Sequence, residues 1–214
     1  MYNLSQYMEK DPAQVRAFMQ QHPFATLIGS DSSGNPVATQ VPLLIREEGN
    51  EIRLIGHIMR KTDHHRVLEQ NPRILALFTS PTAYISPSWY SNPHTGGTWN
   101  YMTVHARGEV RFTSDAELIE ILRETQNLFE NNPASPSNFE NLGDSYVNPM
   151  LKAIVGLDIR VTKLDAVFKL SQNRNEASYQ GIIENLKQGT ADAQYIAAEM
   201  EKRASQLFKK DKTV

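Results

Sequence analysis

The sequence predicts an α+β protein in which an antiparallel β-barrel carries helices at its periphery. Six or seven short segments of apolar or alternating residues follow one another with the spacing of hairpins. The helices are expected at the periphery, and strands separated by long helices, the pattern that marks a parallel sheet, do not dominate. A chain of 214 residues is long enough for one large domain, or for one domain with appendages.

The N-terminal part predicts a helix followed by paired strands. Asp11 followed by Pro12 opens a helix, because an N-cap acceptor precedes a proline at the first helical position, and this helix ends before Pro23. A strand at 24–29 turns at 31–36 onto a strand at 37–45, in which Pro42 indicates an edge or a bulge. Further expected elements are a turn at 48–50, strands at 51–58 and 73–79, and a short helix at 63–70.

The C-terminal part predicts further strands and three helices. Ser114 and Glu117 form a capping box that opens a helix running to about residue 131. The other expected elements are strands at 83–86, 99–112 and 154–170, a loop at 132–146, and two helices separated at 189–190. The domain division is a barrel domain over 1–174 and a helical pair over 175–214, packed on the barrel or on a partner subunit.

Charge and composition exclude several classes of function. The chain has 22 basic and 24 acidic residues and a net charge of −2, which does not favour a polyanionic partner. It has no cysteine, which excludes disulfides, thiolate metal sites and thiol catalysis, and leaves redox chemistry to a borrowed cofactor. The longest apolar run, at 74–78, has five residues, and the N-terminus lacks a signal-peptide pattern. We expect a cytoplasmic protein without a membrane span.

One long window of the chain carries no Asp, Glu, Lys or Arg. It runs from Ile74 to Ala106 and contains both tryptophans and several prolines and glycines. Five aromatic residues lie within 18 positions in it: Tyr84, Trp89, Tyr90, Trp99 and Tyr101. Such a stretch fits a cleft that holds a planar heterocycle, and it equally fits core strands or a dimer interface.

The segment Arg60-Lys61-Thr62-Asp63 is the strongest candidate anion site. Two cations and a hydroxyl stand where a strand meets a helix N-terminus, so the helix dipole and free N–H groups favour a phosphate there. The segment also fits a solvated loop with an Asp N-cap.

The histidines and the C-terminal helices have simpler explanations than metal or DNA binding. His64 and His65 are adjacent on the expected helix and point about 100° apart, so surface or cap positions explain them better than a metal site with His57 or His105. Residues 175–214 hold six basic and six acidic residues, which does not favour direct DNA binding despite Lys209, Lys210 and Lys212. No catalytic residue and no metal ligand is assigned.

Several blocks of the sequence resemble the PaiB family, described as FMN-binding split-barrel proteins and negative transcriptional regulators. The resemblance runs from about residue 1 to 210, and its blocks are Pro23-Phe-Ala-Thr-Leu-Ile28, Gly56-His-Ile-Met-Arg60, Ala83-Tyr-Ile-Ser-Pro-Ser-Trp-Tyr90, Thr98-Trp-Asn-Tyr101, Val104-His-Ala-Arg-Gly108 and Lys169-Leu-Ser-Gln-Asn-Arg174. The sequence departs from the family pattern at 59–63 and at 96–97. Arg60-Lys61 resembles the pair that grips the FMN phosphate in the related pyridoxamine phosphate oxidase barrels.

The resemblance implies a homodimer of split barrels with FMN at the subunit interface. The phosphate would be held by Arg60, Lys61 and Thr62. The flavin ring would be lined by Thr39, Val41, His57 and Ile58, and the cleft would be closed by Trp99, Asn100 and Tyr101. Gln172 and Arg174 resemble a pair that reaches in from the other subunit.

The resemblance leaves the biological role open. The leading hypothesis is an FMN-binding protein that acts as a regulator or as a flavin-dependent oxidoreductase of unknown substrate. The alternatives are a flavin-independent DNA-binding repressor and a haem-binding split-barrel protein that uses His57 or His105 as its ligand.

Overall fold

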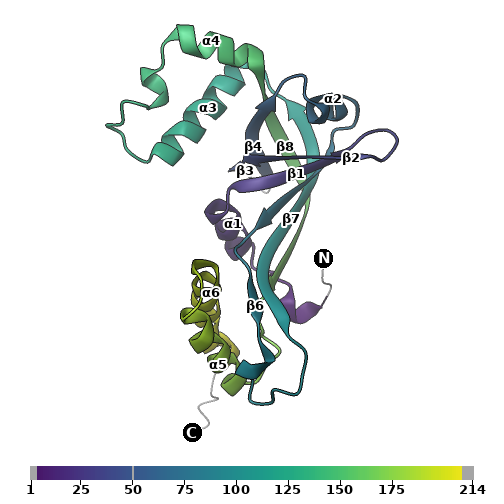
Figure 1. The fold of residues 1–214 in the computed structure, drawn as a ribbon. Helices are drawn as coiled ribbons and strands as arrows, with labels where there is room; N and C mark the ends of the chain where they lie inside the picture. Colours follow the sequence, from purple (N-terminus) through teal and green to yellow (C-terminus); the bar gives the residue numbers. More distant parts are fainter. Residues whose placement is uncertain (1–3, 50, 209–214) are drawn as a thin grey trace. The chain divides into compact units, whose positions relative to one another are not determined.

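The computed structural model describes residues 4–49 and 51–208 and shows a mixed α+β protein (Figure 1). The strands are β1 (Phe24–Ser30), β2 (Pro36–Pro42), β3 (Leu44–Glu48), β4 (Glu51–Met59), β5 (Arg73–Thr79), β6 (Ala83–Ile85), β7 (Thr98–Phe112) and β8 (Ile154–Lys169). The helices are α1 (Pro12–Gln21), α2 (Asp63–Gln70), α3 (Asp115–Glu130), α4 (Asp144–Ala153), α5 (Glu176–Lys187) and α6 (Ala191–Leu207), with short 3-10 turns η1 (Ser5–Tyr7), η2 (Pro87–Trp89) and η3 (Phe139–Asn141). The predicted turn at 48–50 and the predicted helical segment 175–214 end outside the described residues, at Asn50 and at 209–214.

The chain forms two compact units. The sheet unit comprises residues 16–78 and 105–164, and the terminal unit comprises the described parts of 1–15, 79–104 and 165–214. The chain passes from one unit to the other within α1, at the end of β5, within β7 and within β8. The predicted division at residue 174 stays a prediction.

The sheet unit is a curled antiparallel sheet with the strand order β2-β1-β5-β7-β8-β4-β3. Although β2 and β4 are far apart in this order, they contact each other. At this contact, a Cβ on Gly56 would lie 2.9 Å from the carbonyl oxygen of Pro42, so glycine is required for the close approach. The curled sheet confirms the predicted α+β class and the split-barrel architecture of the sheet.

The predicted hairpin between β1 and β2 is confirmed. Its strands pair from Phe24 opposite Pro42 to Ser30 opposite Pro36. The Asp31 carboxylate accepts hydrogen bonds from the backbone N–H groups of Ser33 (2.9 Å) and Asn35 (2.8 Å), and so closes the turn. The prediction of one strand over 37–45 was wrong, because buried Leu43 donates its N–H to the Pro23 carbonyl and separates β2 from β3. Pro42 ends the edge strand β2, as expected for a residue without an N–H.

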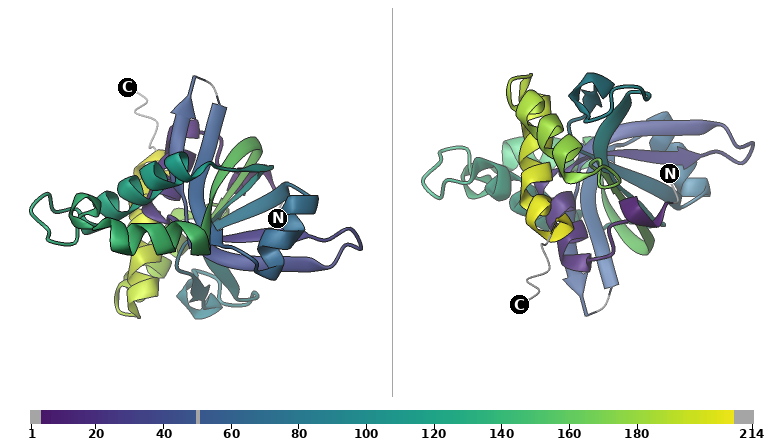
Figure 2. Two further views of the ribbon diagram at one scale, coloured as in Figure 1. Left: turned by 90° about the horizontal axis from the view of Figure 1, so that it is seen from above. Right: turned by 90° about the horizontal axis from the view of Figure 1, so that it is seen from below.

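The helix α4 is the main element that the sequence did not predict. We expected a loop over 132–146, but α4 begins at Asp144 and contains Pro149. Packing explains this helix better than propensity does, because Val147, Met150 and Leu151 lie against a small core of Leu118, Leu122, Phe139 and Ile154. Figure 2 shows α3 and α4 side by side, on the opposite side of the strands from α2.

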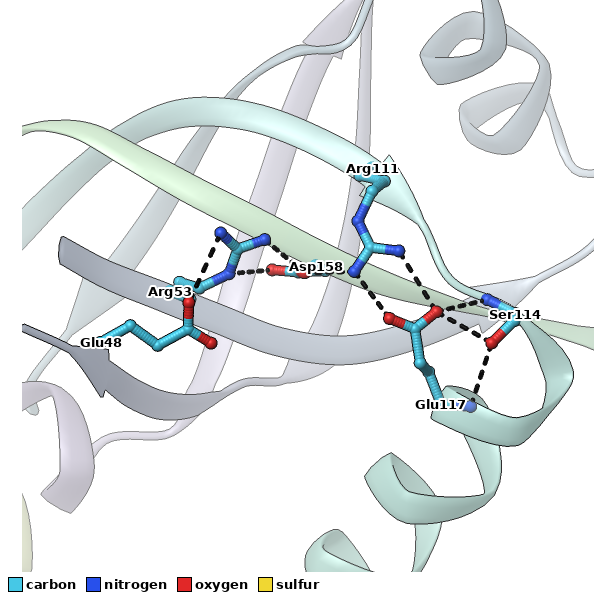
Figure 3. A network of polar contacts seen from close by, with 6 residues as sticks. All are labelled: Glu48, Arg53, Arg111, Ser114, Glu117 and Asp158. Atoms are coloured by element: carbon cyan, nitrogen blue, oxygen red, sulfur yellow. Dashed lines mark hydrogen bonds and ion pairs between the residues drawn. The ribbon is translucent and has the colours of Figure 1, made fainter.

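A network of charged side chains ties α3 to the sheet (Figure 3). Asp158 on β8 is 6% exposed and accepts hydrogen bonds from Arg53 on β4 (2.9 and 2.5 Å) and Arg111 on β7 (2.7 Å). Arg111 also donates to Glu117 (2.8 Å), which forms the predicted capping box with Ser114 at the start of α3. Three strands and one helix are therefore joined through a single buried carboxylate.

The terminal unit is built around the predicted pair of C-terminal helices. α5 packs against α6 and η2, and α6 packs against β6. Tyr179, Ile182 and Met200 are fully buried among these elements. The N-terminal segment joins β8 of the same unit through a bridge between Met8 and Val167. None of the helices in the described ranges is long and apolar enough to span a membrane.

Candidate functional site

The predicted anion segment lies at the junction of β4 and α2. Thr62 is the N-cap of α2, because its hydroxyl accepts the His65 N–H (3.2 Å) and donates to the Met59 carbonyl (3.2 Å). The Arg60 N–H donates to the Ala153 carbonyl (2.8 Å). Lys61 has a φ of 64°, in the left-handed region, so the chain turns sharply at this residue. These bonds hold the two cations at the positive end of the helix dipole.

The two cations of this segment are accessible. The Arg60 side chain is 32% exposed and has an ion pair with Asp115 at 3.5 Å. Lys61 is exposed, and within the part of the chain that the structure describes its ammonium group has no ion-pair partner. Asp63 is the nearest acid in sequence, and its carboxylate accepts the His64 N–H (2.7 Å). The segment can therefore bind an anion with two positive side chains at the start of a helix.

The adjacent histidines are buried in the first turn of α2, just after the N-cap Thr62, so of the two expected positions, surface or cap, the surface position is wrong. His64 is 0% exposed and His65 is 9% exposed. His65 packs on the ring of Phe112, with the ring centroids 4.9 Å apart. The Nδ1 atom of His64 lies 2.8 Å from the Thr39 hydroxyl, and burial lowers the pKa of His64, which Asp63 partly offsets. Among the described residues, no group of three or more His, Asp or Glu side chains is arranged to hold a metal ion.

The predicted ring-lining residues lie on β2 and β4, which contact each other. Val41 and Ile58 are buried, at 7% and 3% exposed. His57 is half-buried, burial lowers its pKa, and its Nδ1 atom has no hydrogen-bond partner among the described residues. The structure thus brings seven of the predicted site residues onto three contiguous parts of the sheet unit: β2, β4 and the turn before α2.

The predicted aromatic residues lie in the terminal unit. Trp99 and Tyr84 are opposite each other on β7 and β6 and form an edge-to-face pair at 5.8 Å, with 54% and 50% of their areas exposed. A Cβ on Gly97 would clash with the Tyr84 ring, which accounts for glycine at this departure from the family pattern. Lys169 is 7% exposed and donates to the Trp99 carbonyl (2.7 Å) and to Thr98.

The remaining predicted residues are engaged within the terminal unit. Asn100 is 0% exposed, accepts a hydrogen bond from the Ser171 hydroxyl (3.0 Å) and donates to the Met200 sulfur (3.4 Å). Gln172 bonds to the backbone of Leu170 (2.7 Å) and Phe168 (2.5 Å). The Arg174 guanidinium lies 4.2 Å from the centre of the Tyr90 ring. Tyr101 is half-buried on β7. The assignment of these residues and of Trp99 to a cofactor stays a prediction.

Sequence reasoning assigned no role to three residues that the structure singles out. His64 is the buried partner of Thr39, Tyr84 is the partner of Trp99, and Lys169 holds the backbone at Trp99. In the sequence, Tyr84 belongs to the cluster of five aromatic residues, and Lys169 belongs to one of the blocks that resemble the PaiB family. The signal for His64 was its place two residues after the N-cap Thr62, on the side of α2 that packs against β1 and β2.

Comparison with known proteins agrees with this fold. Residues 1–163 match the family model described as "Putative FMN-binding domain". The chain is 33% identical over 187 residues to protease synthase and sporulation protein PAI 2 of Bacillus subtilis, with 87% of this chain and 89% of that protein covered.

Two solved structures show the same fold at low sequence identity. The flavocytochrome Anf3 of Azotobacter vinelandii superposes with a TM-score of 0.56 at 15% identity, over 78% of this chain and 72% of that chain. The FAD and heme binding protein of Mycobacterium smegmatis superposes with a TM-score of 0.55 at 14% identity, over 76% of this chain and 73% of that chain. The match to the family model and the Bacillus relative place the chain in the PaiB family of FMN-binding split-barrel proteins.

Proposed function

We propose that the sheet unit binds FMN, with the phosphate on the Arg60-Lys61-Thr62 segment and the ring against β2 and β4. The observation that carries this proposal is the accessible cation pair at the positive end of α2. Arginine and lysine beside a helix N-terminus form charge-assisted hydrogen bonds to phosphate oxygens. The residues proposed to line the ring are Thr39, Val41, His57 and Ile58.

The residues next to this segment suit a flat, neutral heterocycle. Val41 and Ile58 provide buried apolar surface, and the Nδ1 atom of His57 is a buried polar atom without a partner among the described residues. Because burial lowers the pKa of His57, its imidazole is neutral near pH 7 and does not repel or attract a charged group. These residues therefore fit FMN, because uncharged side chains are proposed to contact the ring and the two cations are proposed to contact the phosphate.

Bound FMN would supply hydride or single-electron transfer at its ring. The chain's own part is to hold the phosphate with Arg60 and Lys61, and to offer the ring apolar contacts from Val41 and Ile58. The family description motivates a regulatory role for such a flavoprotein, and the chemistry of FMN motivates an oxidoreductase role. Reduction of the bound flavin by NADH or NADPH, followed as loss of its visible absorption, supports the oxidoreductase role, whereas salt-dependent binding of a DNA fragment supports the regulatory one.

The absorption spectrum of the purified protein tests the proposal. We expect a yellow protein, or a colourless one that becomes yellow when FMN is added and the excess is removed, with FMN identified after release. A protein that takes up no FMN would refute the proposal. A Soret band after reconstitution with haem would instead favour the haem-binding alternative, with His57 or His105 as the candidate ligand.

We extend the proposal to a homodimer, as the family resemblance implies. Phe24 and Met59 support it, since these large apolar side chains of the sheet unit are 66% and 63% exposed. Light scattering during size-exclusion chromatography is expected to give twice the mass of 24.2 kDa. A mass of 24.2 kDa at micromolar concentration would contradict the dimer without affecting the FMN assignment.

Asp115 is expected to weaken FMN binding, because it competes with the phosphate for Arg60. The Arg60–Asp115 pair is exposed and 3.5 Å long, so it contributes no more than about 1 kcal/mol. Asp115→Asn is therefore expected to tighten FMN binding about two- to fivefold in a fluorescence titration. Glu120→Gln on the same helix is the matched control, since Glu120 pairs with Arg123 instead, and it should leave the affinity unchanged. Equal effects of the two substitutions would contradict the competition.

A further inference from the structure

His64 is a buried histidine whose ring has one polar partner among the described residues. It lies in the first turn of α2 and is 0% exposed, with Nδ1 2.8 Å from the Thr39 hydroxyl on β2. Its other ring nitrogen, Nε2, has no hydrogen-bond partner among the described residues. Nε2 faces the backbone of Gly29, where an added Cβ would lie 3.3 Å away. Within this buried ring, Nδ1 therefore has a hydrogen-bond partner, whereas Nε2 has none among the described residues.

The cost of an unpaired donor decides which nitrogen carries the proton of the neutral ring. A proton on Nε2 would leave a buried N–H without an acceptor, which costs about 1–3 kcal/mol. A proton on Nδ1 is donated to the Thr39 oxygen and leaves only a lone pair facing Gly29, which is the cheaper arrangement. His64 is therefore the donor, and the Thr39 oxygen is the acceptor.

This assignment leaves the hydroxyl hydrogen of Thr39 available. A threonine hydroxyl has one hydrogen to donate, and Thr39 has no other polar partner among the described residues. Thr39 is half-buried and stands opposite Leu27, on the side of the hairpin that also carries buried Val41. The sheet unit thus presents a hydrogen-bond donor next to apolar surface, in an orientation set by a buried histidine.

We infer that His64 is a positioning residue that fixes Thr39 as a hydrogen-bond donor to the flavin ring. The inference rests on the proposed function. The acceptors on the ring that this hydroxyl hydrogen can reach are its carbonyl oxygens and unprotonated nitrogens. His64 also lies in the first turn of α2, just after the N-cap Thr62. The same turn of helix therefore positions the proposed phosphate segment and, through His64, the hydroxyl of Thr39.

Thr39→Val and His64→Leu test this inference with FMN and with riboflavin, which has the same ring without the phosphate. Thr39→Val removes the proposed hydrogen bond to the ring, and His64→Leu removes the side chain that orients the Thr39 hydroxyl. Each substitution should therefore weaken the binding of both ligands by roughly three- to tenfold. The double variant should lose no more than the larger single effect, because both substitutions act through one hydroxyl. His64→Asn, whose side-chain amide can donate in the place of Nδ1, should restore most of the affinity.

Two further measurements separate positioning from a structural role. Loss of a hydrogen bond to the ring should also shift the visible absorption bands and the reduction potential of bound FMN, which a loss of stability alone does not do. Thr26→Val is the matched control, since Thr26 stands opposite Gln40 and so faces the other side of the same hairpin; it should change neither the affinity nor the spectrum.

The outcomes are distinguishable. If the wild-type protein binds neither ligand, the proposed function fails and this inference fails with it. If the wild-type protein binds FMN but Thr39→Val binds FMN and riboflavin like the wild type, only the inference is overturned. Additive losses for Thr39→Val and His64→Leu would also overturn it. If His64→Leu does not fold, the comparison of Thr39→Val with His64→Asn still decides the question.

Discussion

Replacing Arg60 and Lys61 together by alanine is expected to weaken FMN binding about a hundredfold or more. Hydrogen bonds to a charged group contribute about 1.5–3 kcal/mol each, so the loss of two reaches at least about 3 kcal/mol. Riboflavin binding should hardly change, because the ring-lining residues on β2 and β4 are untouched. Quenching of flavin fluorescence in a titration with each ligand measures both effects.

Arg66→Ala is the matched control for this double substitution. Arg66 is an exposed cation on α2, beyond the N-terminal turn that faces the proposed phosphate. Its loss should weaken FMN binding less than about twofold, as expected for a screened surface charge. An equal loss of affinity in the control and the double variant would show that FMN responds to net charge, and would contradict the assignment to residues 60–62.

Asp158→Asn is expected to destabilise the fold by about 2–4 kcal/mol. Asp158 is the buried carboxylate between Arg53 and Arg111, and the neutral amide removes the charge that they share, so that Arg111 keeps only Glu117 and Arg53 keeps only the exposed Glu48 at 4.0 Å among the described residues (Figure 3). Breaking a buried pair by removing one partner costs about 3–5 kcal/mol, and Arg111 is partly exposed, which reduces the loss. Urea unfolding followed by circular dichroism measures the change.

Glu109→Gln provides the control for this stability prediction. Glu109 pairs with Arg160 at 3.0 Å, and both side chains are about half exposed. Exposed pairs contribute about 0–1 kcal/mol, so the free energy of unfolding should change far less than in Asp158→Asn. A loss in Asp158→Asn no larger than in this control would mean that the network in Figure 3 does not hold α3 on the sheet.

The stability difference between the wild type and Asp158→Asn should also depend on pH. Burial alone would raise the pKa of Asp158, but the hydrogen bonds from Arg53 and Arg111 outweigh burial and hold it below 3.8. The folded state therefore binds the proton less readily than the unfolded state. The contribution of Asp158 is full above about pH 4 and is lost as the pH falls through the folded-state pKa. The difference should be constant near neutral pH and should shrink below pH 4.

The parts of the fold that the sequence predicted are those governed by local chemistry. The turn closed by Asp31 and the capping box of Ser114 and Glu117 depend on residues a few positions apart, so short motifs reveal them. The helix α4 contains a proline and depends on contacts with Leu118 and Phe139, which lie elsewhere in the chain. Packing of this kind overrides propensity, and a single sequence does not show it.

The residues of the candidate site likewise fall into those that a local sequence pattern predicted and those that only the structure reveals. Arg60, Lys61 and Thr62 were recognisable because a phosphate site needs cations at a helix start, and that pattern is contiguous. The role of His64 could not be recognised in the sequence, because it depends on Gly29 and Thr39, which the β1–β2 hairpin brings against α2. The resemblance blocks contained Lys169 and Asn100, but only the structure shows that Lys169 holds the backbone at Trp99 and that the Asn100 amide is engaged with Ser171 and Met200.

Calorimetric titration of the wild-type protein with FMN and with riboflavin tests the central claim most directly. The claim is that the sheet unit binds FMN and that its phosphate contacts Arg60 and Lys61. We therefore expect one FMN per chain, and riboflavin bound at least about a hundredfold more weakly, since it lacks the phosphate with which both cations form charge-assisted hydrogen bonds. Equal affinity for the two ligands, or no binding of FMN, would contradict the claim.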